Sequence, residues 1–174
     1  MQNGTTSLSL SLSSDEIAFY RSVAMRAAYL SMGRPDLQYA CRELAKAMAQ
    51  PTQRHMTALK RLARYLRLKP RLMQHFPYQE VVTELTCWAD SDHAGCVRTR
   101  KSTSGGVIMH GRHVLKTYSK GQAVIALSSA EAEYYGLVSA TSHLLGEVSL
   151  AKDWGMAMSP KIFMDATAGI AIGS

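Results

Sequence analysis

Three acidic residues stand where their carboxylates could act together. Asp90 closes an apolar, β-rich segment, 81–90, and Asp165 closes a shorter one, 161–165. Glu133 lies near the start of the long helical pattern between them, and the 3.6-residue period places it at the end of that helix's apolar stripe. A carboxylate at the edge of a buried stripe is costly unless it is paired, protonated or bound to a metal.

Converging carboxylates could hold divalent cations. All-oxygen ligands favour Mg²⁺ or Mn²⁺ over zinc, and two such ions about 3.5–4 Å apart can activate water and stabilise the leaving oxygen of a phosphodiester. In the simpler interpretation the aspartates cap turns and Glu133 is merely amphipathic, and spacing alone leaves both open. Glu131 has a different expected role, because Ser128-x-x-Glu131 matches a capping box.

Two other patterns are weaker. His110-x-x-His113, with Cys87 and Cys96 upstream, lacks the cysteine spacing of structural zinc sites, so the histidines are expected to flank a hairpin. The serine pair before the long helix has no elbow glycines around it, and a helix cap is the better interpretation.

The elements that would position these residues fall into two groups. Helices are predicted over about 13–32, ending at Gly33, over 35–50 and over 52–68. Strands are predicted at 81–90, 103–111, 114–120 and 161–165, with a helix to about 154 before the last strand and the start of another helix after it. This order predicts an α/β unit with a mixed sheet and packed helices, preceded by a small three-helix unit. Residues 1–14 are of low complexity and are predicted to be a flexible leader.

Composition bounds the class of protein. The chain has 174 residues, 47% of them hydrophobic, which is enough for a core. No apolar run has the length of a membrane helix, so no membrane partner is expected. Three cysteines without a C-x-x-C pair fit a reducing, intracellular compartment, either cytoplasmic or nuclear.

Basic residues gather in two blocks without acids. Seven lie between Arg54 and Arg71 and six between Arg98 and Lys120, against a net charge of +7. Such blocks suit a polyanion, because each neutralised phosphate releases counterions, although a solvated surface explains them about equally well. The candidate nucleic-acid contacts are Lys60, Arg61, Arg64, Arg98, Arg100, Lys101 and Lys120.

Four sequence blocks resemble a known family. ADSDHAGCVRTRKSTSGGVIMHG and YSKGQAVIALSSAEAEYYGL contain, in order, D-x-D-x-A-G, T-R-K-S-T-S-G, S-K-x-Q and A-L-S-S-x-E-A-E-Y. These are similar to the ribonuclease H domain of copia-type LTR retrotransposon Pol polyproteins. Residues 15–72, with YRS, RPD and PTQRHMTALKRLARYL, resemble the thumb or connection segment that joins the reverse transcriptase to that domain. The resemblance covers about residues 15–174.

The resemblance implies particular ligands. The family's metal-binding acids fall on Asp90, with Asp92 as runner-up, on Glu133 and on Asp165. Two Mg²⁺ or Mn²⁺ ions would be bound there. The chain departs from the family's usual residues at His93, Tyr118, Gly121 and 166–168. The domain at 81–174 is expected to be incomplete at its C-terminus, without a fourth carboxylate, so slow turnover is expected.

The implied function is hydrolysis of the RNA strand of an RNA–DNA hybrid, within a Pol polyprotein that includes the reverse transcriptase. Two alternatives stay open at this point: a non-catalytic nucleic-acid-binding fragment, and a decayed retroelement product without activity. Mg²⁺-dependent cleavage of hybrid separates the first interpretation from both.

Overall fold

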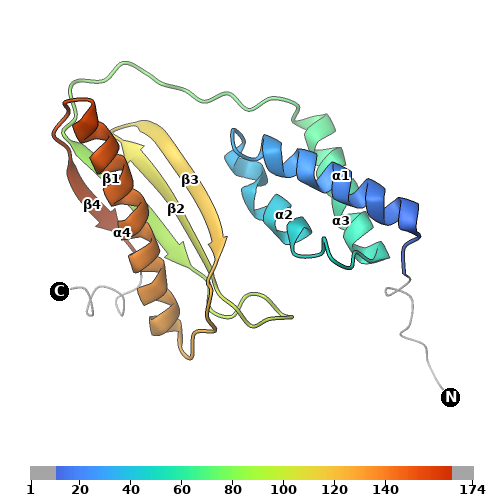
Figure 1. Ribbon diagram of the computed structural model, residues 1–174. Coiled ribbons are helices and arrows are strands. Elements are labelled where there is room, and N and C mark those ends of the chain that lie inside the picture. Colours follow the sequence, from blue (N-terminus) through green and yellow to red (C-terminus); the bar gives the residue numbers. More distant parts are fainter. Residues whose placement is uncertain (1–10, 166–174) are drawn as a thin grey trace. The chain divides into compact units, whose positions relative to one another are not determined.

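The computed structural model of the protein describes residues 11–165 and separates the chain into two compact units (Figure 1). The first unit is Met1–Gln74 and the second is His75–Ser174. Each unit has its own hydrophobic core. In the part of the chain described, no helix is long and apolar enough to cross a bilayer.

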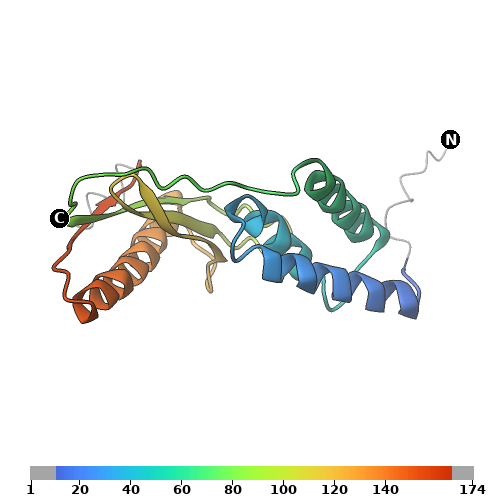
Figure 2. The same ribbon diagram turned by 90° about the horizontal axis from the view of Figure 1, so that it is seen from above.

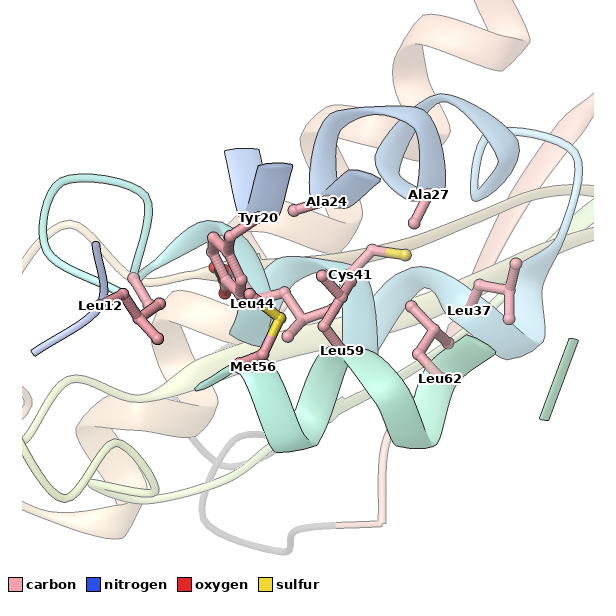
Figure 3. Close-up of a cluster of buried hydrophobic side chains, with 11 residues drawn as sticks. Leu12, Tyr20, Ala24, Ala27, Leu37, Cys41, Leu44, Met56, Leu59 and Leu62 are labelled. Atoms are coloured by element: carbon pink, nitrogen blue, oxygen red, sulfur yellow. Dashed lines mark hydrogen bonds between the residues drawn. The ribbon is translucent and has the colours of Figure 1, made fainter. Parts of the chain in front are cut away.

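The first unit packs three helices, α1 (Ser14–Leu30), α2 (Pro35–Ala45) and α3 (Gln53–Leu68). Ser13 caps α1 in a complete capping box with Glu16, as the sequence predicts. The buried side chains gather between the three helices, and Tyr20, fully buried, donates its hydroxyl to the carbonyl oxygen of Leu44 at 2.7 Å (Figure 3). The core residues are Leu12, Tyr20, Ala24, Ala27, Leu37, Cys41, Leu44, Ala47, Met56, Leu59 and Leu62.

Several predicted limits of this unit are wrong. The helix α1 ends at a cap on Ser31 and not at Gly33, and α2 stops at Ala45, five residues before the predicted end. The predicted leader is too long, because Ser11 bridges Thr52 and Leu12 is buried in the core. A single β-bridge and a single buried leucine cannot be recognised by pattern alone in a low-complexity stretch. The rest of the predicted leader, residues 1–10, lies outside the described residues.

The second unit is built on a mixed four-stranded sheet, so the chain is α/β in the described residues. Its strands are β1 (Glu84–Ser91), β2 (Thr103–His110), β3 (His113–Gly121) and β4 (Ser159–Phe163), in the order β3-β2-β1-β4. The strands β1, β2 and β3 pair antiparallel, while β4 pairs parallel with β1. The parallel pair requires a crossover, and α4 (Ser129–Asp153) supplies it.

The crossover helix α4 covers one face of this sheet (Figures 1 and 2). Alternate residues of β1, namely Leu85, Cys87 and Ala89, form one buried cluster with Ile108 of β2 and with Ala140 and Leu144 of α4. The predicted apolar stripe of α4 is therefore confirmed. Near the sheet's end the two elements approach closely, since a Cβ added at Gly136 would lie 3.2 Å from the Cβ of Ser91.

The predicted strands shift by a few residues. The first strand begins at Glu84, because residues 75–83 run beside the β2–β3 hairpin and bind it through side chains: the Gln79 amide nitrogen donates to the carbonyl of His110. The last strand ends at Phe163, so Asp165 lies two residues beyond it. The turn at Gly111 has a φ of 58°, as a tight hairpin requires. The helix predicted after Asp165 lies outside the described residues.

Candidate active site

Glu133 occupies the second turn of α4, and the start of that helix is firmly fixed. The Ser128 hydroxyl accepts a hydrogen bond from the backbone N–H of Glu131 at 3.1 Å. The Glu131 carboxylate accepts from the backbone N–H of Leu127 and from the Tyr135 hydroxyl. The predicted serine cap is confirmed, while the glutamate half of the box binds one residue earlier than predicted. Glu131 is therefore committed to the helix start, and Glu133 is left for another role.

The Glu133 carboxylate has an unsatisfied, buried oxygen. Its Oε2 atom is shielded from solvent and has no hydrogen-bond partner. Burial raises the pKa of Glu133 above its usual range, and the negative charges of Asp90 and Asp165 raise it further. Asp90 and Asp165 are thus near enough to act electrostatically on Glu133. In residues 11–165, however, no group of three or more His, Cys, Asp or Glu side chains is close enough to form a ready metal cluster.

Asp90 is the penultimate residue of β1, and its exposed side chain accepts a hydrogen bond from the backbone N–H of Ser91 at 2.8 Å. Asp92 does a different job. Its backbone N–H donates to the carbonyl of Thr103, and its carboxylate accepts from the backbone N–H of the same threonine. The geometry favours Asp90 over Asp92 as the partner of Glu133.

Asp165 follows β4, which pairs in parallel with the strand that carries Asp90. Trp88 is the register partner of Phe163, so each aspartate follows its aromatic residue by two positions. The two rings stack with centroids 4.4 Å apart and planes at 15°, which fixes this register. Both aspartates therefore belong to the same end of the sheet, where α4 begins.

The four candidate nucleic-acid contacts of the second block lie in two places. Arg98, Arg100 and Lys101 lie in the loop between β1 and β2, and Lys120 lies near the end of β3, all in the same unit as the acids. Arg98, Arg100 and Lys120 are exposed. Lys101 is partly engaged, since its ammonium group donates to the carbonyl of Ala123. This bond connects the β1–β2 loop to the loop after β3, at the end of the sheet that carries the acids.

The basic residues of the first block, Lys60, Arg61 and Arg64, are exposed on α3, in the other unit. On the same helix Met56, Leu59 and Leu62 are buried, whereas Ala63 is exposed.

The histidine pair is structural. The Nε2 of His110 lies 2.8 Å from the carbonyl oxygen of Val82, and that of His113 lies 2.7 Å from the carbonyl oxygen of Pro77. A carbonyl only accepts, so both rings use these nitrogens as donors. The predicted hairpin role is confirmed, and both rings anchor residues 75–83.

Comparison with known proteins agrees with the sequence blocks. Over 150 residues, 84% of its length, the chain is 35% identical to the "Retrovirus-related Pol polyprotein from transposon RE2" and 33% identical to that from transposon RE1, both of Arabidopsis thaliana. The chain is a homologue of retrovirus-related Pol polyproteins of plant transposons. It spans 10% of the length of each of these two relatives.

A further relative of this Pol homologue is the "Secreted RxLR effector protein 161" of Plasmopara viticola, 37% identical over 62% of this chain and 75% of that protein. No family model and no solved structure matches the chain.

Some residues of the Pol-like blocks have roles that the sequence does not predict. Gln122, the glutamine of S-K-x-Q, is buried and hydrogen-bonded to Ser91, Ser104 and the backbone of α4. Its only sequence signal is a polar residue at the end of a strand, which is equally typical of an exposed loop. Of the three acids, in contrast, Asp90 stands at the end of a strand and Glu133 near the start of α4, as predicted, while Asp165 lies two residues beyond its strand.

Proposed function

We propose that residues 75–165 form the core of a ribonuclease H-like nuclease, which hydrolyses the RNA strand of RNA–DNA hybrids within a Pol polyprotein. One observation carries the proposal: Glu133 keeps a buried oxygen without a partner while two further carboxylates, Asp90 and Asp165, act on it electrostatically. A buried carboxylate beside other negative charges destabilises the fold unless a bound cation neutralises the repulsion. Carboxylates with such perturbed pKa values are concentrated at functional sites.

The residues present fit Mg²⁺ or Mn²⁺. Asp90, Glu133 and Asp165 offer only carboxylate oxygens, the ligands that these hard cations prefer. The Oε2 atom of Glu133 would be available to coordinate the cation, because it has no hydrogen-bond partner. A pair of bound ions would activate water and stabilise the leaving oxygen of the phosphodiester.

The chain's own residues supply position and charge for this reaction. The cap on Ser128 holds the first turns of α4, and the β1–β4 register holds the two aspartates at one end of the sheet. Arg98 and Arg100 lie in the β1–β2 loop, where they would contact phosphates without reading bases. Discrimination of RNA from DNA would come from 2′-hydroxyl groups and helix shape. Because hybrid forms where RNA is reverse-transcribed, the proposed location is inside the cell, in the cytoplasm or the nucleus.

A single-turnover cleavage assay tests this function. The 174-residue protein, made in a host strain that lacks its own ribonuclease H, is mixed in excess with labelled RNA–DNA hybrid and Mn²⁺. We expect slow cleavage of the RNA strand that stops on chelation and is abolished by Asp90→Asn. Absence of cleavage by the unchanged protein, or equal cleavage by the Asp90→Asn variant, would exclude the proposal.

The acid-free face of α3 favours an additional role in binding nucleic acid. Lys60, Arg61 and Arg64 are exposed within one short stretch of that helix. Reversing each charge is expected to weaken binding to all sequences about equally and to reduce the slope of affinity against salt by about one. Arg26→Glu is the matched control, because Arg26 is exposed on α1 outside both basic blocks. Binding that depends on α3 without any cleavage would favour the non-catalytic alternative.

A further inference from the structure

A buried polar cluster lies at the end of the sheet that carries the acids. It consists of the side chains of Gln122, Ser91 and Ser104 with the backbone carbonyl of Ala132, and it is called the Gln122 cluster below. Gln122 is 9% exposed, Ser91 8% and Ser104 3%. Polar groups this deeply buried are stable only when they are hydrogen-bonded to one another.

The cluster joins four elements through one amide group. The Gln122 Nε2 atom lies 2.8 Å from the carbonyl oxygen of Ala132, 3.0 Å from the Ser104 hydroxyl and 3.1 Å from the Ser91 hydroxyl. The Ser91 hydroxyl also donates to the carbonyl of Ala132, at 3.0 Å. These bonds connect the end of β1, the start of β2, the residue after β3 and the first turns of α4.

The orientation of the amide follows from its partners. The Ala132 carbonyl can only accept, so the nitrogen and not the oxygen of Gln122 must face it. The backbone N–H of Gln122 donates to the carbonyl of Ser102 at 2.8 Å, which fixes the residue from the other side. The remaining Oε1 atom is buried without a partner, so the amide is held by its nitrogen alone.

Both ends of the cluster adjoin a proposed metal ligand. Ser91 directly follows Asp90, and Ala132 directly precedes Glu133. We propose that Gln122 is a positioning residue that sets the separation of Asp90 and Glu133, and thereby the affinity of the site for divalent cations. This inference rests on the proposed function of the acids.

A purely structural role would predict something different. Loss of buried hydrogen bonds anywhere in the unit lowers stability, whereas only bonds beside the acids should change cation affinity. His110 provides the matched comparison, because its ring binds the Val82 carbonyl and its register partner is Leu85, at the opposite end of β1 from Asp90. Removal of a group that orients a metal ligand without touching the metal typically weakens metal affinity by about 10–100-fold.

The experiment measures Mn²⁺ binding to the 174-residue protein by electron paramagnetic resonance of the free ion, with thermal unfolding recorded in parallel. The variants are Gln122→Met, which keeps volume and removes the donor, His110→Leu and Asp90→Asn. We expect Gln122→Met to raise the Kd for Mn²⁺ at least about tenfold. His110→Leu should lower the unfolding midpoint while leaving the Kd within about twofold, because it acts far from the acids.

A Kd for Gln122→Met within about twofold of the unchanged protein would overturn the inference. If Gln122→Met does not unfold cooperatively, the Ser91→Ala variant is measured in its place. Ser91→Ala removes only the hydroxyl that donates to the carbonyl of Ala132. An unchanged Kd for Mn²⁺ in Ser91→Ala would also overturn the inference. Sensitivity to Asp90→Asn together with insensitivity to the cluster variants overturns this inference alone. Insensitivity to Asp90→Asn overturns the proposed function as well.

Discussion

At the scale of single residues, Glu133 is subject to opposing influences. Its place near the start of α4 favours a negative charge, because the helix dipole is positive there. Burial and the charges of Asp90 and Asp165 oppose that charge and raise the pKa of Glu133. The carboxylate is therefore kept at a cost to stability, which is understandable if its role lies in binding.

Asp90 and Asp92, the two aspartates of D-x-D, are expected to have different roles, which alanine substitution of each should reveal. Asp92→Ala should lower the free energy of unfolding by about 1–2 kcal/mol, because its carboxylate accepts the Thr103 N–H that closes the β1–β2 loop. Asp90→Ala should instead weaken Mn²⁺ binding more than about tenfold, with a smaller effect on unfolding. Urea unfolding and Mn²⁺ titration of both variants check this, and the reverse pattern would identify Asp92 as the ligand.

At the scale of elements, local signals predict α4 well. Ser128 caps the N-terminus of α4, and its buried residues follow the helical period. Gly155, with a φ of 80°, lies just beyond the C-terminal end of the helix. Strand limits are less predictable, because pairing and not composition decides them. Residues 81–83 are β-rich, yet the described strand β1 begins only at Glu84.

The same distinction applies to the candidate site. Helical period identifies the face of Glu133, and strand ends identify the two aspartates. The register that aligns Asp165 with Asp90, and the bonds from Gln122 to the backbone of Ala132, depend on contacts between segments distant in sequence. No local pattern encodes such contacts, so the residues that position the site could not be predicted.

The stacked aromatic pair is expected to hold β4 in register. Phe163→Ala removes the stack with Trp88 and the contact with the Lys161 ammonium group. We expect a loss of about 2–4 kcal/mol in unfolding free energy, below the full value for a buried phenylalanine because the pair is partly exposed. Mn²⁺ affinity should fall too, since Asp165 follows by two residues. Trp154→Ala, at an exposed tryptophan after α4, is the control and should change neither quantity.

An ion pair at the start of α2, between Arg34 and Asp36, should make the helical unit sensitive to acid. The Arg34 guanidinium donates two hydrogen bonds to Asp36 and lowers the pKa of that carboxyl to about 2. The Tyr65 hydroxyl donates a third bond to the same carboxylate, which connects α2 to α3. A carboxyl whose pKa is depressed on folding stabilises the fold above its unfolded pKa of about 4, and this stabilisation is lost as the pH falls towards 2.

Asp36→Asn should therefore cost about 1–2 kcal/mol at pH 7 and progressively less at pH 4 and pH 3. Urea unfolding at the three pH values measures the difference. Tyr65→Phe, which removes only one of the bonds, should have a smaller effect at pH 7. A cost for Asp36→Asn that is the same at all three values would show that the carboxylate's charge is not what stabilises the helices.

At the scale of the whole molecule, the two units have separate cores. Scanning calorimetry should therefore show two unfolding transitions, and Asp36→Asn should lower only one of them. Phe163→Ala should lower only the other, because Phe163 lies in the second unit. A single transition shifted by both variants would mean that the units unfold as one cooperative body.

The parallel strand β4 has a consequence for the order of folding. The hairpin of β2 and β3 joins neighbouring segments, but β4 reaches β1 only after the hairpin and the whole of α4 have been made. Closing so long a loop is entropically expensive and slow. We therefore expect Asp165 to join the other acids late in folding. The ribosome must synthesise almost the whole sheet unit before the three carboxylates can meet. Until that moment the nascent chain carries Asp90 and Glu133 without the third acid.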